Sequence, residues 1–587
     1  MNPLRIVLFR NIPEDAKLRS EWNALARSVD YPQVFYTHEW ALAVQRAYEA
    51  TLPPMLFLAY DGEEKLCGVV ALALDKTAGG ISFLCATTGD YCDFLSSKQD
   101  RLAFVAGVLA ELRRQDFDRL SLTNLPADSA TIAALRTASL ESGYHFFART
   151  AYECAQVALD SLPRRDGKVV QPQARKFRRC MNGMARDLPV RVEHLQSFEQ
   201  VGPLLSQFAL MHTGRFLTTG RIGNLARAER RRFVEVLAKM LGDAGWLRLS
   251  VIVKGQKIVA WNYGFQFEDS WFWYQPTFDS ELEKHSPGFC LLSKIIEDAA
   301  GTSNVRIVDL GLGAEEYKGS VANQTRETLY VTLRRSRAEH SREVLRYRAA
   351  RFVTSRPTLE KGIRRFFERI KDIRARLSEE GAFAVSKRWF GNLLWSDTEV
   401  LFFEAGVDSA LEPKPTRLQL LGINDLALAV EQYVDDRQTC AYFLRCAKRL
   451  RQSAIQGYGL VDEAGQYVHF AWVTPFERFF LSELNAATEA PSSDCVMLFD
   501  CWTPAAQRGR GYYGYAAARI AKIMRVQGKN PWIFSAASNV SSVRGLEKAG
   551  FQKRYSLIRK RRFGCQWVTG EVPKLQQTKI AEVSAQV

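Results

Sequence analysis

Two stretches of this sequence combine residue types that could do chemistry at the end of a buried strand. In the first, VDLGLGAEEYKGSV at 308–321, Asp309 ends an apolar strand, and Tyr317 and Lys318 follow a glycine-containing turn. A carboxylate, a phenol and an amine at one strand end could carry out proton transfer. The competing interpretation is a packed tyrosine and a solvated lysine, so the pattern predicts a candidate site whose chemistry stays open.

The second stretch joins a strand to a helix through glycines. The apolar run CVMLFDCWTP ends at Pro504, and AAQRGRGYYGYAAARIAKIM follows it. Gly509 and Gly511 free the backbone where the helix begins, and the first-turn amides of a helix have no partner within the helix. Those amides, the positive end of the helix dipole and the charges of Arg508 and Arg510 predict an anion site.

This loop and the later segment NVSSVRGLEKAGF, which starts at Asn539, resemble two motifs of the GNAT superfamily of N-acetyltransferases. The first motif is the pyrophosphate loop, Arg/Gln-x-x-Gly-x-Gly/Ala, which residues 508–513 match up to the last place. The second motif is Asn-x-x-Ser/Ala followed by Glu-Lys-x-Gly-Phe, which residues 539–551 match. The resemblance extends over residues 416–560.

The GNAT resemblance implies that acetyl-CoA or another acyl-CoA is the acyl donor. It implies that the backbone amides of residues 509–514 hold the CoA pyrophosphate, and that strand 495–503 parts from its neighbour and pairs with the pantetheine arm. The cofactor-binding residues implied in this way are Trp502, Arg508, Gly509, Arg510, Gly511, Tyr512, Tyr513, Gly514, Asn539 and Ser542. Tyr513 stands where the motif has a small residue, which binding tolerates if the side chain points outward.

The catalytic groups of this segment are less defined than its phosphate loop. Leu546 occupies the place at which many GNAT enzymes carry the tyrosine that protonates the leaving thiolate. Tyr512 or Tyr555 could take over that role. Asp500 is the candidate general base for the acceptor, although an aspartate that faces solvent or pairs with an arginine is the simpler interpretation. A degenerate, non-catalytic domain is a further alternative.

The front half carries a second resemblance. Short blocks in order, FYTHEWALA at 35–43, GDYCDFL at 89–95, KFRR at 176–179 and WFWYQPTFD at 271–279, are similar to the bacterial CelD-like or BioF2-like acetyltransferases. That family is related to the FemAB aminoacyltransferases. The resemblance extends over residues 30–335 and implies two GNAT-type lobes, with Asp309, Tyr317 and Lys318 in the second.

The positive charge of the chain is concentrated between these two regions. Of the formal net charge of +16, residues 334–388 account for +10, because they hold 17 Lys and Arg against 7 Asp and Glu. Apolar residues recur there at helical spacing from Phe366 to Leu377, which predicts a basic amphipathic helix. This helix either packs its apolar stripe on a neighbouring domain or contacts an anionic membrane surface through residues 361–377. No RNA-binding or zinc-finger pattern accompanies the charge, so no nucleic acid partner is expected.

Length and composition favour an ordinary multidomain protein. The 587 residues are 47% hydrophobic and 25% charged, as in globular chains, and suggest roughly four folding units. No apolar run approaches the ~20 residues that span a bilayer, and the N-terminus is too polar for a signal peptide. These features predict a cytoplasmic protein, peripheral at most at the inner face of the membrane. The 11 cysteines form no C-x-x-C pair and the 7 histidines no H-E-x-x-H motif, so no metal is expected.

Strands and helices alternate on both sides of the basic stretch, which predicts an α/β fold with mixed, mostly antiparallel sheets and a basic helical linker. The two resemblances imply that these α/β blocks are three GNAT-like lobes. The predicted boundaries are 1–165 and 166–333 for the lobes of the CelD-like module, 334–397 for the linker and 398–587 for the C-terminal GNAT domain. The predicted activity is acyl-CoA-dependent N- or O-acyl transfer to an amine or hydroxyl of a cell-envelope or exopolysaccharide precursor. Two alternatives stay open: a FemAB-type aminoacyltransferase that uses charged tRNA, and a non-catalytic scaffold of a polysaccharide-synthesis complex.

Overall fold

The computed structural model describes residues 4–77, 79–165, 168–170, 173–313, 315–355, 395–406, 413–563 and 565–573. The chain forms two compact units: a front unit of residues 1–215 and 223–355, and a C-terminal unit of residues 216–222 and 356–587. The basic helix predicted at 361–377 lies outside the described residues.

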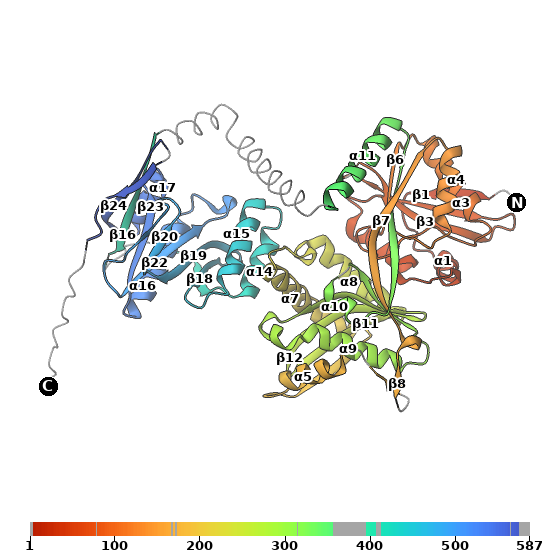
Figure 1. Cartoon of the computed structure of the whole chain (residues 1–587), viewed down its shortest axis with the longest axis horizontal. Helices are drawn as coiled ribbons and strands as arrows, with labels where there is room; N and C mark the ends of the chain where they lie inside the picture. Colours follow the sequence, from red (N-terminus) through yellow and green to blue (C-terminus); the bar gives the residue numbers. More distant parts are fainter. Residues whose placement is uncertain are drawn as a thin grey trace. The chain divides into compact units, whose positions relative to one another are not determined.

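The front unit is built on one sheet of 13 strands in the order β1-β2-β3-β4-β6-β15-β7-β14-β13-β12-β11-β10, with β5 paired to β3 (Figure 1). Its strands are β1 (Arg5–Phe9), β2 (Pro54–Tyr60), β3 (Leu66–Asp75), β4 (Gly80–Phe83), β5 (Leu95–Ser96), β6 (Arg119–Pro126), β7 (His145–Ala158), β10 (Val190–Leu195), β11 (Leu247–Lys254), β12 (Lys257–Phe267), β13 (Ser270–Phe278), β14 (Ile307–Leu312) and β15 (Gln324–Arg334). A small separate pair is formed by β8 (Arg164–Arg165) and β9 (Lys168–Val169).

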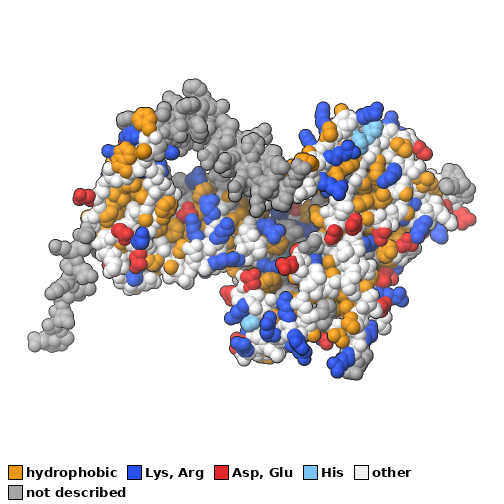
Figure 2. All heavy atoms as spheres, in the orientation of Figure 1, with side chains coloured by type: hydrophobic (Ala, Val, Ile, Leu, Met, Phe, Trp, Pro, Cys, Tyr) orange, Lys and Arg blue, Asp and Glu red, His pale blue; other side chains and the backbone are white. Residues whose placement is uncertain are grey.

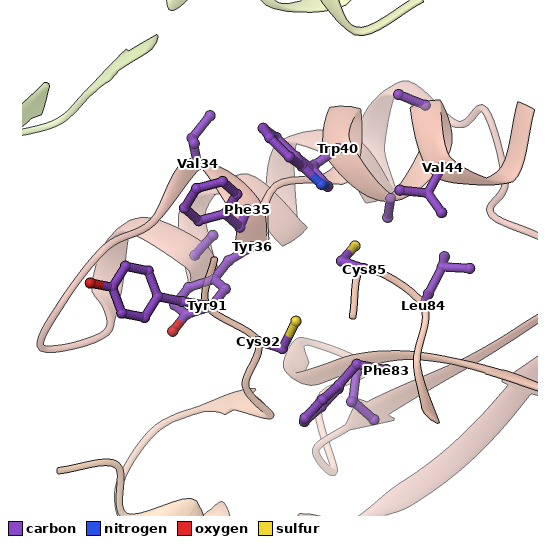
Figure 3. Packing of buried hydrophobic residues seen from close by; sticks show 14 of the residues in the cluster. Val34, Phe35, Tyr36, Trp40, Val44, Phe83, Leu84, Cys85, Tyr91 and Cys92 are labelled. Atoms are coloured by element: carbon purple, nitrogen blue, oxygen red, sulfur yellow. The ribbon is translucent and has the colours of Figure 1, made fainter. Parts of the chain in front are cut away.

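Helices cover both faces of this sheet, so alternate side chains of a strand enter different cores. On β11, Leu249 and Val251 join the cluster that includes α8, whereas Ile252 joins the cluster that includes α9. Figure 3 shows the part of the first cluster around α2, where Phe35 and Trp40 pack edge to face with ring centroids 4.7 Å apart. The helices are α1 (Ala16–Ser28), α2 (His38–Tyr48), α3 (Arg101–Arg114), α4 (Thr131–Glu141), α5 (Ala174–Met184), α6 (Phe198–Val201), α7 (Leu205–Thr218), α8 (Ala228–Asp243), α9 (Pro287–Ala300), α10 (Glu316–Gly319) and α11 (Arg337–Thr354).

Two long strands hold the halves of the front sheet together. β15 lies between β6 and β7 and pairs antiparallel with both. The end of β7 also pairs with β14. On β15, Val331 and Leu333 are fully buried. A strand from the end of the unit therefore completes the sheet that its first residues begin.

The C-terminal unit contains an eight-stranded sheet in the order β17-β18-β19-β22-β23-β16-β24-β25. Its strands are β16 (Trp395–Ala405), β17 (Thr416–Leu420), β18 (Gln456–Asp462), β19 (Tyr467–Pro475), β22 (Cys495–Trp502), β23 (Asn530–Ala536), β24 (Phe551–Arg562) and β25 (Cys565–Thr569), with a separate pair β20 (Phe479–Leu481) and β21 (Ala486–Thr488). Its helices are α14 (Ile423–Gln432), α15 (Arg437–Arg449), α16 (Tyr512–Val526) and α17 (Val540–Lys548). The first strand, β16, inserts between β23 and β24 and begins before residue 398.

Most strand pairs are antiparallel. The parallel pairs among the described residues are β4–β6 and β13–β14 in the front unit and β22–β23 in the C-terminal unit, and the last two part along their length. β13 and β14 pair only from Ser270 to Phe272 on β13, and β22 and β23 pair only from Cys495 to Leu498 on β22. All four strands continue beyond these residues. The predicted α/β class with mixed sheets is confirmed, and so is the predicted parting of strand 495–503 from its neighbour.

The Leu333→Ala variant tests how far β15 stabilises the front unit. Leu333 is fully buried, and truncating a buried leucine leaves a cavity, so we expect the free energy of unfolding to fall by roughly 2–5 kcal/mol. Urea unfolding of the full chain measures the change. Glu327→Ala, an exposed position on the same strand, is the control, and we expect it to shift stability by less than about 0.5 kcal/mol. Equal effects of the two variants would contradict a central role for β15.

Candidate active sites

The C-terminal unit opens where its parallel strands part. β22 and β23 pair as far as Leu498 and Ile533, after which β22 stays with β19 and β23 stays with β16. A register shift between β22 and β19 marks a bulge, at which Asp500 adopts a φ of +43°. Beyond Leu498, one edge of β22 therefore has no strand partner among the described residues.

The loop after β22 turns sharply into helix α16. Gly509 and Gly511 have φ values of +79° and +73°, a left-handed conformation that residues with a Cβ rarely adopt. Gly511 is the N-cap of α16, and no side chain caps the helix there. The free amides of the first turn are therefore available to an anion, as the sequence predicts.

A cleft of about 650 Å³ lies at the opening of these strands and the start of α16. Every predicted cofactor-binding residue except Arg510 lines it. The lining residues are Cys501, Trp502, Thr503, Gln507, Arg508, Gly509, Gly511, Tyr512, Tyr513, Gly514, Tyr515, Asn539, Ser541, Ser542, Gly545 and Lys548. The segments 501–515 and 539–548, between which β23 lies in the sequence, thus meet around one cavity.

One wall of the cleft is the close contact between α16 and α17. A Cβ on Gly514 would lie 2.7 Å from the carbonyl oxygen of Gly545, so only glycine permits this approach. The Tyr513 side chain is expected from the motif to point outward, which would let the motif tolerate its size. This expectation is wrong. Instead its ring packs beside Gly545, and its hydroxyl accepts a hydrogen bond of 2.9 Å from Ser542. Asn539 caps α17 by accepting a hydrogen bond from the Ser542 amide.

The other wall is aromatic. Trp502 stacks on Tyr442 with ring centroids 5.2 Å apart, and its indole N–H donates to Thr439 Oγ1 at 3.2 Å. The Arg508 guanidinium lies 5.6 Å from the centre of the Trp502 ring and donates to the Thr503 carbonyl. These contacts hold the Arg508 guanidinium beside the predicted anion site.

Two further residues near the cleft carry no signal in the sequence. The Lys414 ammonium lies 5.7 Å from the centre of the Tyr512 ring and 3.7 Å from the place a Cβ on Gly511 would take. His469 is buried, and burial lowers its pKa to about 3, so it is neutral near pH 7. Its Nδ1 lies 2.8 Å from Oγ1 of Thr503, which lines the cleft. Neither residue belongs to a sequence motif, so only the folded structure identifies them as neighbours of the cleft.

Of the candidate acid and base groups of this unit, the fold places only one at the cleft. Asp500 does not line the cleft and forms an ion pair with Arg449, which is the simpler of its two interpretations. Leu546 is fully buried in the core. Tyr555 stacks on Phe402 at 4.5 Å in a separate aromatic cluster away from the cleft lining. Of the two tyrosines considered as acids, only Tyr512 lines the cleft.

In the front unit, Asp309 is a buried carboxylate that accepts three hydrogen bonds. It is 1% exposed and accepts hydrogen bonds from the Tyr91 hydroxyl at 2.9 Å, the Gln156 amide at 2.7 Å and the Gly311 backbone N–H at 2.8 Å. Burial raises its pKa, while these hydrogen bonds oppose that rise. Because its acceptor sites are engaged from several elements, Asp309 primarily organises the strand end.

Asp90 is the functional candidate that sequence reasoning did not single out. Its carboxylate occupies the place that a side chain on Gly311 would take. The pKa of Asp90 is raised to about 7, chiefly by burial and next by the nearby Asp309 carboxylate, while the Lys318 ammonium opposes the rise. The block GDYCDFL contained this residue, but its environment depends on β14.

Tyr317 and Lys318 also have structural partners. The Tyr317 hydroxyl accepts a hydrogen bond of 3.1 Å from the Trp273 indole, and burial raises the pKa of Tyr317 to about 12. Lys318 is 4% exposed, donates to the Leu312 carbonyl at 2.7 Å and pairs with Glu315 at 2.8 Å. The competing interpretation of Lys318 as a solvated lysine is therefore wrong, because its side chain is buried and holds the turn that follows β14.

The opening between β13 and β14 is occupied by the chain itself. The hydroxyl of Tyr274, just beyond the last paired residue of β13, donates to the backbone carbonyl of Thr88. Tyr91 bonds to Asp309, and Asp90 lies against Gly311 on the other strand. The loop 88–91 thus fills the place that corresponds to the open cleft of the C-terminal unit.

The described residues contain neither a cluster that could hold a metal nor a helix that could span a membrane. No group of three or more His, Cys, Asp or Glu side chains there is arranged to hold a metal ion. Among the helices described, none is long and apolar enough to span a membrane.

We expect Gly514→Ala to separate α16 from α17. The added methyl meets the Gly545 carbonyl, and such overpacking costs about 1–3 kcal/mol. Thermal unfolding of the full chain should show a lower midpoint for the C-terminal unit. Arg544→Ala, an exposed change on α17, is the control, and similar melting of both variants would contradict the close approach.

We expect Asp90 to make the front unit less stable as the pH rises. Its pKa is raised from 3.8 to about 7 on folding, so its favourable contribution is complete below the unfolded pKa and is lost as the pH rises through the folded value. The loss is at most about 1.4 kcal/mol per pH unit. Urea unfolding at about pH 5 and about pH 8 should show a smaller decrease for Asp90→Asn than for the wild type, and identical decreases would refute the assignment.

Part of the front unit is similar to a known protein family. Residues 172–319 match the family model described as an acetyltransferase (GNAT) domain. The comparison with curated proteins gave no match.

Several solved structures are similar to the chain over little more than half its length. L-PGS from Bacillus licheniformis has 12% identity and a TM-score of 0.37, covering 57% of this chain and 96% of its own. FemX has 9% identity and a TM-score of 0.37, covering 53% and 95%. A tandem GNAT protein from the clavulanic acid biosynthesis pathway has 14% identity and a TM-score of 0.33, covering 56% and 98%. Over residues 172–319 the chain is therefore similar to a GNAT acetyltransferase domain.

Proposed function

We propose that this protein is an acyl-CoA-dependent acyltransferase that binds its acyl donor in the C-terminal cleft. The observation that carries the proposal is the cleft of about 650 Å³ at the parted strands, onto which the uncapped start of α16 opens. Acetyl-CoA or another acyl-CoA fits this arrangement because it combines a pyrophosphate with a pantetheine arm that carries amide groups.

Each part of such a donor has a complementary surface. The pyrophosphate would lie on the first-turn amides of α16, where the helix dipole favours an anion. Arg508 and Lys414 add positive charge beside the loop. The pantetheine amides would pair with the free edge of β22 beyond Leu498, as an added strand does.

The reaction transfers the acyl carbon from sulfur to an amine or hydroxyl. The acceptor atom forms a bond to the acyl carbon, and the carbon–sulfur bond breaks. The acceptor loses a proton, and the departing thiolate gains one. Tyr512 is the proposed proton donor, because it lines the cleft whereas Tyr555 does not. Asp500 would have to leave Arg449 before it could act as the base.

For the front unit we propose two GNAT-like lobes that do not hold the donor in the manner of the C-terminal unit. Loop 88–91 fills the opening of the domain at 172–319. Asp309 and Lys318 support that opening, while Asp90, with its pKa near 7, and Tyr317 are the groups there that could exchange a proton. The chain would then bind one acyl-CoA.

The acceptor that we propose is an amine or hydroxyl of a cell-envelope or exopolysaccharide precursor, which rests on the CelD-like sequence blocks of the front half. The two alternatives are an aminoacyltransferase that takes its acyl group from charged tRNA and a non-catalytic scaffold. Binding of acyl-CoA by the full chain favours the first proposal over both alternatives.

Titration calorimetry of the full chain with acetyl-CoA tests the donor site. We expect one equivalent to bind to the wild type, and Gly511→Val to weaken binding at least about tenfold, since a β-branched residue strains the left-handed turn and blocks close approach of the phosphates. Gly528→Val is the matched control, because Gly528 has a φ of +71° but does not line the cleft. No binding at all would reject the function, and two equivalents, or unchanged binding by Gly511→Val, would reject the site.

A further inference from the structure

The hairpin of β24 and β25 forms one edge of the C-terminal sheet and has an unusual composition. β24 ends in four consecutive basic residues, Arg559 to Arg562, and Phe563 begins the turn. In the register of the hairpin, Lys560 lies opposite Trp567 and Arg559 opposite Val568. β25 is the last strand of the sheet, so its outer edge has no strand partner within the described residues.

Apolar side chains at this hairpin end are exposed to solvent. Phe563 is 77% exposed, Trp567 45% and Val568 37%. Single exposed apolar residues are ordinary on protein surfaces. Three of them within six positions, on a hairpin whose preceding strand ends in four cations, form a surface that combines apolar and positive character. In Figure 2, hydrophobic and basic side chains lie side by side over the end of the unit where β16 and β24 run in Figure 1.

The positive charge of the hairpin is only partly balanced. Near the hairpin, the neighbouring strand β16 supplies two carboxylates, Asp397 and Glu399, while its third, Glu404, pairs with Arg554. Arg562 forms an ion pair with Asp397, and Arg559 donates a hydrogen bond of 3.2 Å to Thr398 Oγ1. Four cations against two carboxylates leave a net positive surface beside the exposed apolar groups.

We propose that this hairpin end, residues 559–563 and 565–568, is a docking surface for an anionic lipid membrane. Aromatic side chains are favoured at the boundary between lipid and water, and basic side chains are attracted to anionic headgroups. A membrane is favoured over a nucleic acid because an aliphatic side chain such as Val568 gains from lipid but does not stack on bases.

The chain connectivity supports the same partner. The basic sequence at 361–377, predicted as a membrane contact, precedes β16. β16 begins at Trp395, which lies opposite Arg562 in the sheet. The chain that leaves the basic sequence therefore enters the folded unit at the hairpin end. The proposal is independent of the acyl-transfer reaction.

A fluorescent label on Cys565 tests the contact locally. Cys565 lies on the hairpin and is exposed, whereas burial raises the pKa of Cys67 to about 11 and that of Cys501 to about 12, which suppresses their reactivity. A polarity-sensitive thiol dye on the full chain should shift to the blue with vesicles that contain phosphatidylglycerol, and not with pure phosphatidylcholine. Cys565→Ser checks the labelling. An unchanged spectrum with phosphatidylglycerol vesicles would overturn the proposal.

Vesicle flotation of the unlabelled full chain gives the second test. We expect Lys560→Glu/Arg561→Glu and Phe563→Ser/Trp567→Ser each to lower the bound fraction at least about fivefold at low salt, and the charge effect to weaken at high salt. Arg417→Glu, an exposed change on β17 at the opposite edge of the sheet, is the control and should bind as the wild type does. Wild-type binding by both hairpin variants, or binding to RNA without binding to vesicles, would overturn the proposal.

Discussion

The C-terminal site depends on the point at which backbone pairing between β22 and β23 stops. Buried N–H and C=O groups need partners, and here each strand keeps them on its other side, β22 from β19 and β23 from β16. The bulge at Asp500 takes up the difference in register. The inner edge of β22 can therefore face a cleft without collapse of the sheet, and the start of α16 opens onto the same space.

Both units complete their sheets with a strand from a distant part of the chain. β15 enters between β6 and β7, and β16 enters between β23 and β24. Such pairing requires long loops to close before it contributes stability, which makes it slow and highly non-local. The inserted strands stabilise the sheet next to the candidate sites. β7, which pairs with β15, also pairs with β14, which carries Asp309, and β16 pairs with β23.

The partings of β13 from β14 and of β22 from β23 have different surroundings. In the C-terminal unit the opening is lined by glycines, a stacked tryptophan and cations, which suits an anionic donor. In the front unit, Asp90 and Tyr91 enter the opening between β13 and β14 from another part of that unit. The same backbone arrangement thus offers a ligand cleft in one unit and an internal polar network in the other.

Local features were predictable from the sequence because a few adjacent residues determine them. The left-handed turns at Gly509 and Gly511 and the start of α16 follow from residue type and short-range periodicity. β15 and β16 were not predicted, since their charged residues obscure the apolar alternation and only pairing makes them central. The inward ring of Tyr513, the ion pair of Asp500 and the pKa of Asp90 depend on groups far away in the chain. Burial and charge proximity are properties of the folded chain, so the tertiary structure alone decided them.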